Sequence, residues 1–347
     1  MTHPSRRHRS RSRLLAVTLA LPLLLGACSA GAEPTTERPA GDDDAATTGQ
    51  DAAGGATTGW PRTVEVHEAS VEIAAAPQRV VALSTETGDL ALELVGHDRV
   101  AAVATGSVTE GAGNQLDEAG QVETVLPPGT TPDPEQILAL EPDLVLITSR
   151  HEGEESAADI LAESGVPALV FTSADFGTPD AVAASLRTLG TALGAEGQAE
   201  TAAEALEAQV AEVTRAVAGA TEQPRVLTLM ARGDQVMITG LGSTLTTLTQ
   251  LAGGDAVAEE QGWNGTVPAD PELLVAAAPD VILVEDFRGT GMAPFTDLLA
   301  AQALSGVPAI AADQVHLVPS SEVSGSAGLH LADGLRTVAA LLHPDLF

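Results

Sequence analysis

The chain has 347 residues, of which 44% are hydrophobic, so it is long enough for one large two-lobed body or two ordinary domains. Aromatic residues make up only 2% and tyrosine is absent, so Ala, Val, Leu and Ile must build the core. The formal net charge of −32, with basic residues clustered only between Arg6 and Arg13, excludes nucleic-acid binding, because a polyanion would be repelled.

The N-terminus has the pattern of an export signal. A basic stretch, "RRHRSRSR", precedes the short apolar run "LLAVTLALPLLLGAC", which predicts a signal peptide over residues 1–27. The run ends in Leu25-Gly26-Ala27-Cys28, which resembles the lipobox of bacterial lipoproteins, in which the cysteine is diacylated. We therefore expect an exported protein that Cys28 anchors to the outer face of the cell membrane, since two acyl chains suffice for stable anchoring. The alternative is an ordinary signal peptide with a chance cysteine.

Residues 28–62 contain little that could be buried, and they predict a disordered tether. The alternating stretch "TVEVHEASVEI" then predicts a short hairpin. Strand and helix patterns alternate over the following residues, which predicts an N-terminal lobe over 63–177 with a parallel sheet. Its expected strands are "RVVALS", "RVAAVATG", "DLVLI" and "VPALVFTS", and its first helix is "ETGDLALELVG".

Residues 178–222 are rich in Ala, Glu, Leu and Gln and predict a connecting helix, either one long helix or two broken near Gly194–Gly197. The alternating pattern restarts over 223–347, which predicts a C-terminal lobe. Its expected elements are the strand "RVLTLMA" with its hairpin partner "QVMITG", the strands "DVILV" and "ADQVHLVPS", and the helices "STLTTLTQLAGG" and "AGLHLADGLRTVAALLH".

One stretch occurs twice, as "DPEQILALEPDLVLI" at 133–147 and as "DPELLVAAAPDVILV" at 270–284. In each copy an Asp suits the helix N-cap, a Pro suits the first helical position and a Glu suits the first turn. A second Pro then ends the helix before a buried strand. Two helix–strand units can acquire these residues independently. Their identical spacing inside two similarly ordered halves favours two equivalent lobes.

These stretches, together with "PQRVVALSTETGDLALELVGHDRVAAVATG", resemble the substrate-binding lipoproteins of ABC importers that carry haem, cobalamin and siderophores. Within that class, "VMITGLGSTLTTLTQLAGGDAV" and "GTVPADPELLVAAAPDVILVEDFRG" are most similar to haemin-binding proteins. The resemblance covers about residues 63–345. It implies an α/β fold of two Rossmann-like lobes with parallel sheets joined by a long rigid helix. It also implies a ligand cleft between the lobes, a monomer, and delivery of a haem or related iron chelate to ABC permease subunits.

Ligands of open α/β sheets bind beyond the carboxyl ends of the strands, and in a two-lobed body those ends should face each other across a cleft. The residues near the expected strand ends, with one from the loop before the second repeat copy, are the ligand-binding candidates: Ser84, Glu86, Arg150, His151, Arg232, Trp263 and Arg288.

The candidates differ in the chemistry that they offer. His151 is the candidate iron ligand, because imidazole suits iron; the alternative is a solvated loop histidine. The arginines can bind carboxylates such as haem propionates, or they can be structural ion-pair partners. Trp263 can stack on a porphyrin face, since the Gly and Asn residues around it suggest an exposed turn.

The missing tyrosine bears on the cargo. Haem-carrying members of the class commonly ligate iron through Tyr, His or both, and where relatives often have Gly-Tyr this chain has Gly262-Trp263. An indole N–H cannot ligate iron. The alternative cargo is therefore a ferric siderophore, which brings its own iron ligands, or cobalamin.

The class docks on its permease through one carboxylate on each lobe. The resemblance implies Asp89 for the first lobe, and Glu259 or Glu260 for the second. An enzyme is the remaining alternative, but no nucleophile elbow, P-loop, zinc motif or dinucleotide fingerprint is present, so we expect none.

Overall fold

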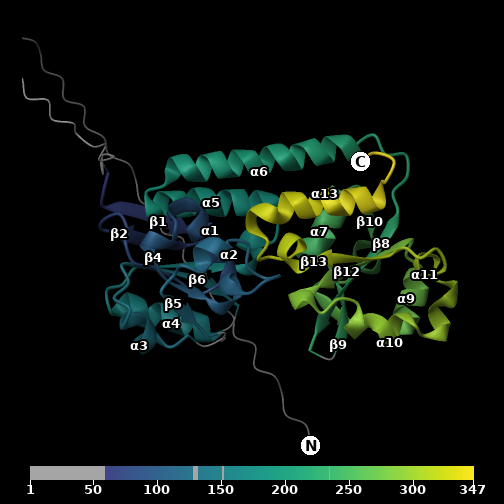
Figure 1. The fold of residues 1–347 in the computed structure, drawn as a ribbon, viewed down its shortest axis with the longest axis horizontal. Coiled ribbons are helices and arrows are strands. Elements are labelled where there is room, and N and C mark those ends of the chain that lie inside the picture. Colours follow the sequence, from purple (N-terminus) through teal and green to yellow (C-terminus); the bar gives the residue numbers. More distant parts are fainter. Residues whose placement is uncertain (1–58, 128–131, 151, 234) are drawn as a thin grey trace, which may run out of the picture. The chain divides into compact units, whose positions relative to one another are not determined.

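Two large β-sheets, a separate two-stranded hairpin and the helices around them make up the part of the chain that the computed structural model describes, residues 59–127, 132–150, 152–233 and 235–347 (Figure 1). The expected signal peptide, Cys28 and most of the expected tether lie outside these residues. The longer helices are α1 (Thr85–Val95), α4 (Glu152–Glu163), α5 (Pro179–Leu193), α6 (Glu196–Val217), α7 (Thr244–Leu251) and α13 (Leu331–Leu342). The shorter ones are α2 (Leu116–Ala119), α3 (Pro134–Leu138), α8 (Val257–Gln261), α9 (Pro271–Ala277), α10 (Thr296–Leu299), α11 (Pro308–Ala311) and α12 (Ser320–Val323). The 3-10 turns are η1 (His97–Arg99), η2 (Thr105–Val108), η3 (Ser173–Phe176), η4 (Phe287–Gly289), η5 (Ala293–Phe295), η6 (Gln302–Gly306) and η7 (Gly328–His330).

The first lobe follows the sequence prediction. The expected hairpin is present, with strand β1 antiparallel to β2, and the sheet behind it is parallel throughout, in the order β5-β4-β3-β6-β7. The strands of this part are β1 (Arg62–Val66), β2 (Ala69–Ile73), β3 (Val80–Ala82), β4 (Val100–Ala104), β5 (Thr124–Leu126), β6 (Leu144–Ser149) and β7 (Ala168–Thr172). Parallel strands are linked by helices that cover the sheet, so their apolar runs are buried.

The second sheet is mixed: the resemblance implies a parallel sheet, but the hairpin that the sequence predicts for "RVLTLMA" and "QVMITG" is present and belongs to it. Its order is β11-β9-β8-β12-β13, with β10 also paired to β8; β9 is antiparallel to both β8 and β11. The reason is local, because a short turn after β8 returns the chain as a hairpin, and a parallel return would need a crossover helix. The strands are β8 (Arg225–Arg232), β9 (Gln235–Thr239), β10 (Asp255–Ala256), β11 (Thr266–Pro268), β12 (Val281–Asp286) and β13 (Val315–Pro319).

The repeated stretch has the same structural role in both lobes. Asp133 and Asp270 each cap a helix, α3 or α9, through their side chains, and each copy then continues into a central strand, β6 or β12. The second Asp of each copy binds the backbone at the start of the neighbouring strand. Asp143 accepts hydrogen bonds from the backbone N–H groups of Gln78 (2.7 Å) and Arg79 (2.9 Å), and Asp280 accepts one from that of Arg225 (3.0 Å). The two lobes are therefore equivalent at this unit.

The connecting segment is two helices, not one. Helix α5 ends at Gly194, which has the left-handed conformation (φ 68°), and α6 begins two residues later and packs along α5 (Figure 1). Glycine adopts this conformation without a steric penalty, which makes it the preferred residue for ending a helix. The far half of α6 reaches the second lobe, where Glu212 accepts from Arg336 of α13 at 3.1 Å.

One hydrophobic cluster continues from the first lobe into the second. It includes buried residues of α1 and α5, of α6, and of α7 and α13, such as Leu92, Leu189, Leu206, Leu248 and Leu335. The opposite faces of the two sheets have separate clusters, one in each lobe. The lobes therefore share a core on the side of α6. None of the helices in the described ranges has both the length and the apolar character of a membrane span.

Candidate functional site

Loops at the carboxyl ends of the strands in the two lobes meet. Gly111, after β4 and η2, lies beside η4, which follows β12: a β-carbon at Gly111 would be 3.9 Å from the backbone nitrogen of Gly289. Three residues later, the side chain of Asn114 is hydrogen bonded to backbone carbonyls that follow β13. The strand ends of both sheets therefore face each other, which is the arrangement that the fold class predicts.

Ser84 lies at the end of β3, as expected, but its hydroxyl is already engaged. It caps α1 by accepting from the backbone N–H of Thr87 (3.2 Å), and it shares hydrogen bonds with the hydroxyls of Thr148 (2.7 Å) and Thr87 (2.9 Å). Ser84 is buried. Its position supports a structural role, joining the first helix to the central strand β6.

Glu86 and Arg150 come together at the edge of the first sheet and form an ion pair. The carboxylate side chain is 11% exposed and the guanidinium 34%. A pair that is only partly exposed is screened less by salt than one on an open surface. Arg150 is therefore partly neutralised, and only the donors of its guanidinium that Glu86 does not use remain for a ligand.

Two of the predicted ligand-binding residues cannot be placed in this site. His151, and with it the expected iron ligand, lies outside the described residues. Arg288 belongs to η4 beside the strand end of β12, but its side chain is also outside what the structure describes.

The second lobe contributes charged groups of both signs. Arg232 ends β8, is exposed, and forms no ion pair with another described residue. Glu285, near the end of β12, is buried and accepts from the hydroxyl of Ser320 at 2.8 Å. Burial raises the pKa of Glu285, and the Ser320 hydrogen bond opposes this. Glu285 and Ser320 each follow from an expected strand end, but the contact between them depends on how β12 and β13 pair, which the sequence does not show.

Trp263 lies away from these strand ends, against the prediction of a stacking wall in the cleft. Its backbone oxygen accepts from Leu241, just after β9. Because β9 is antiparallel to β8, this end of β9 lies beside the start of β8. The start of β8 is about 20 Å along the strand from Arg232, which ends β8. Trp263 is half-buried and packs against the hydrophobic cluster of the second lobe. The backbone turn around Trp263 is exposed, whereas its indole ring packs at the margin of the hydrophobic core of the second lobe.

The predicted docking carboxylates have different environments. Asp89 is 4% exposed, so it cannot present a charge to a permease, and that prediction is wrong. Asp89 is the fifth residue after Ser84, the N-cap of α1, and Leu248 is the fifth residue after Ser243, the N-cap of α7. Leu248 is buried, so the equivalent position in α1 also faces inward. Glu259 and Glu260 of α8 are exposed. Glu259 accepts from the side chain of Gln250 (2.8 Å) and Glu260 pairs with Arg225 (2.5 Å).

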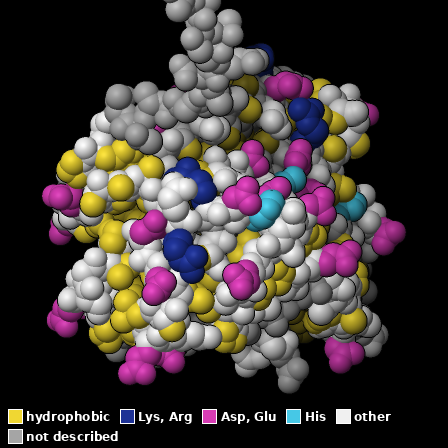
Figure 2. Space-filling model, turned by 60° about the vertical axis from the view of Figure 1, so that its left-hand side comes forward, with side chains coloured by type: hydrophobic (Ala, Val, Ile, Leu, Met, Phe, Trp, Pro, Cys, Tyr) yellow, Lys and Arg dark blue, Asp and Glu magenta, His cyan; other side chains and the backbone are white. Residues whose placement is uncertain are grey.

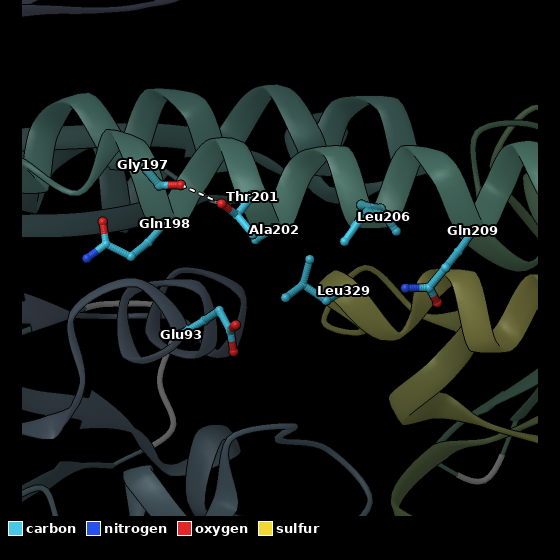
Figure 3. Close-up of a pocket in the computed structure, with 9 residues that line it drawn as sticks. Glu93, Gly197, Gln198, Thr201, Ala202, Leu206, Gln209 and Leu329 are labelled. Atoms are coloured by element: carbon cyan, nitrogen blue, oxygen red, sulfur yellow. Dashed lines mark hydrogen bonds between the residues drawn. The ribbon is translucent and has the colours of Figure 1, made fainter.

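A groove of about 630 Å³ lies on another side of the lobe junction, beneath α6 (Figure 3). Gln198 and Thr201 of α6 line one wall, and Glu93 of α1 and Leu329 of η7 line the other. The groove is therefore bordered by both lobes, but none of the predicted ligand-binding residues lines it.

The protein surface is acidic as a whole. On the face in Figure 2, acidic side chains are dispersed and outnumber the arginines. The six arginines and six carboxylates before residue 59 cancel, so residues 59–347 account for the whole net charge of −32. Any anionic ligand must overcome this field before it meets Arg150 or Arg232.

Comparison with known proteins agrees with the fold. The family model described as periplasmic binding protein matches residues 80–322. Among solved structures, the periplasmic heme-binding protein RhuT from Roseiflexus sp. RS-1 is 22% identical with a TM-score of 0.66, over 78% of this chain and 99% of that one. A periplasmic heme-binding protein from Pseudomonas aeruginosa is 23% identical with a TM-score of 0.64, over 77% and 93%. Helicobacter pylori CeuE is 16% identical with a TM-score of 0.66, over 82% and 89%.

At these identities the solved structures show the fold alone, and no curated protein matches the chain. The match to the family model nevertheless covers most of the chain. The two-lobed α/β fold expected from the sequence is confirmed. The family consists of binding proteins, so the expectation that the chain is not an enzyme is confirmed as well.

Proposed function

Because this chain belongs to the periplasmic binding protein family, we propose that it is the solute-binding subunit of an ABC importer and delivers haem or a related iron chelate to the permease. The observation that supports this most directly is the meeting of the strand ends of both lobes, with Arg150 and Arg232 on those ends. Guanidinium groups bind carboxylates with two parallel hydrogen bonds, which suits the propionates of haem.

A titration of the purified protein with haemin, followed by absorbance, tests this proposal. We expect a saturable change of the Soret band, and an affinity at least about tenfold lower for Arg232→Ala, because a hydrogen bond to a charged group contributes about 1.5–3 kcal/mol. Arg215→Ala is the matched control, since Arg215 is exposed on α6, away from the strand ends. His151→Ala should change the Soret spectrum itself if His151 ligates the iron. Equal affinities for the Arg232 and Arg215 variants would contradict the proposed role of Arg232.

The absence of tyrosine favours a second candidate cargo, a ferric siderophore or cobalamin. A siderophore already fills the coordination sphere of iron, so the protein needs to supply only hydrogen bonds and charge. Ferrioxamine B and cyanocobalamin are suitable probes in the same titration. Tight binding of either one, with no saturable response to haemin, would replace haem by this second class.

We also propose that residues 1–27 are removed on export and that Cys28 is acylated, with residues 28–62 as the tether. The lobes would then extend over 63–177 and 223–347, joined by 178–222, and act as a monomer at the outer face of the cell membrane. Glu259 and Glu260 remain the proposed permease contact of the second lobe, supported by their exposure. Fractionation of cells that express Cys28→Ser tests the anchor: the variant should leave the membrane fraction, whereas the wild-type protein should stay in it.

A further inference from the structure

A single side chain of the first lobe binds a loop of the second lobe. The Asn114 amide nitrogen lies 3.1 Å from the backbone oxygen of Ser321, 3.2 Å from that of Ser326 and 3.0 Å from that of Ala327. Its two N–H groups are thus shared among three carbonyls that follow β13. These bonds join residues that are more than 200 positions apart, so they fix the contact between lobes rather than a local turn.

The position of Asn114 is itself held by a buried carboxylate. Its backbone N–H donates to Oδ2 of Asp89 at 2.7 Å. The other carboxylate oxygen, Oδ1, is buried and accepts no hydrogen bond from any described residue, and the nearby Ser107 hydroxyl is also buried with no hydrogen-bond partner in the described part of the chain. Asp89 is therefore desolvated, and Asn114 covers it from the side of the second lobe.

We propose that Asn114, held by Asp89, is the positioning residue that sets the relative orientation of the two lobes around the cargo. The groove beneath α6 borders the same junction, since Gln115 donates to Glu93 at 2.6 Å and Leu329, on the same wall as Glu93, follows the Asn114-bound loop. This unfilled space leaves room for the lobes to shift when the Asn114 contact breaks.

The state of this contact depends on pH. Burial raises the pKa of Asp89 from its ordinary value of 3.8 to about 7, against the opposing effect of the hydrogen bond from the Asn114 backbone N–H. Among the described groups, Glu86 adds to the rise through its charge. The elements packed against α1 carry further titratable groups: Asp117 and Glu118 on α2, His97, Asp98 and Arg99 on η1, Asp180 and Arg187 on α5, and His330 on η7; α1 itself also carries Glu93.

The direction of the pH effect follows from linkage. When the junction opens, water reaches Asp89 and its pKa falls back towards the ordinary value. The closed junction therefore binds the proton more tightly, so its advantage over the open junction is fully present below about pH 4 and is lost as pH rises towards 7 and Asp89 ionises. Between pH 6 and pH 8 the ratio of open to closed molecules should rise by up to about tenfold.

Hydrogen exchange measured by mass spectrometry on the full chain, without cargo, tests this inference independently of what the protein carries. After correction for the intrinsic pH dependence, exchange in segments 105–115 and 320–330 should rise by up to about tenfold from pH 6 to pH 8. The buried strand β12 serves as the reference for global unfolding, and its exchange should stay slower than that of both segments at each pH.

Variants of Asp89 and Asn114, each with a matched control, distinguish the contributions of the two residues. Asp89→Asn should abolish the pH dependence, whereas Asp98→Asn, with its side chain 93% exposed, should leave it intact. Asn114→Ala should raise exchange in segment 320–330 at both pH values; Asn264→Ala, at an exposed asparagine of the second lobe, should not. Any one of three results would overturn the proposal. Exchange in the wild-type protein does not rise between pH 6 and pH 8, the pH dependence persists in Asp89→Asn, or the exchange of segment 320–330 is unchanged in Asn114→Ala.

Discussion

At the scale of single residues, Asp89 and Trp263 show how partners distant in sequence determine what a side chain does. Asp89 has the polar character of a surface residue, but it sits at an inward position of α1 and is covered by the loop that carries Asn114. Trp263 is flanked by residues typical of an exposed turn, yet its ring packs against the second lobe's core. In both cases the environment comes from other segments of the chain.

The buried carboxylate of Asp89 predicts a pH-dependent stability. Its pKa is raised on folding to about 7, so the folded state binds the proton more tightly than the unfolded state does. The contribution of Asp89 to stability is therefore fully present below about pH 4 and is lost as pH rises towards 7. Between pH 5 and pH 8, Asp89→Asn should gain about 3 kcal/mol in unfolding free energy relative to the wild-type protein.

Urea denaturation of both proteins across this pH range measures the difference. Asp98→Asn is the control, since an exposed aspartate should change stability little at any pH. Parallel stability curves for Asp89→Asn and the wild-type protein would show that Asp89 titrates normally in the folded state.

At the scale of elements, the pair α5–α6 is held by close packing and by charge. Gly190 of α5 faces α6, and a β-carbon there would lie 2.3 Å from the β-carbon of Ala199. Beside this contact, Arg187 of α5 pairs with Glu200 (2.9 Å) and Glu207 (2.7 Å) of α6. These charges are exposed, so the close packing contributes more to the stability of the pair than the ion pairs do.

Replacing Gly190 by alanine should therefore destabilise the protein. The added methyl group would force the two helices apart, and overpacking of this kind costs about 1–3 kcal/mol. Gly197→Ala, in the first turn of α6, has open space around it and should leave stability unchanged or raise it by up to about 1 kcal/mol. Thermal unfolding of the two variants compares them directly; equal melting temperatures would mean that α5 and α6 are not in close contact at Gly190.

At the scale of the whole molecule, the charge of the body determines how a cargo approaches. Residues 59–347 carry the whole net charge of −32, and the arginines at the strand ends act only at short range. A screened field of this size still influences the encounter over about 10 Å at 0.1 M salt. The sign of the cargo's charge should therefore be visible in its association rate.

Stopped-flow measurements with two probes test this expectation. The association rate of haemin, whose propionates make it anionic, should rise as salt increases, because screening weakens the repulsion. The rate for ferrioxamine B, which is cationic, should fall over the same range. A haemin rate that falls with salt would show that the arginines at the strand ends dominate the approach instead.

Patterns within short stretches of sequence determined much of this fold. The caps at Asp133 and Asp270 and the apolar runs of β6 and β12 depend on neighbours a few residues away, so the sequence alone predicts them, whereas it left the helix end at Gly194 as one of two alternatives. The match between the repeat copies likewise predicts two equivalent lobes. At the edge of the first lobe, Glu86 and Arg150 were both expected from the strand ends.

Only the tertiary structure decided which side chains meet. It paired Arg150 with Glu86, put Trp263 at the other end of a mixed sheet, buried Asp89, and joined Asn114 to a loop more than 200 residues later. The physical reason is that strand register and burial arise from contacts between distant segments. Periodicity and capping signals describe a side chain's own helix or strand, but not the surface that packs on it.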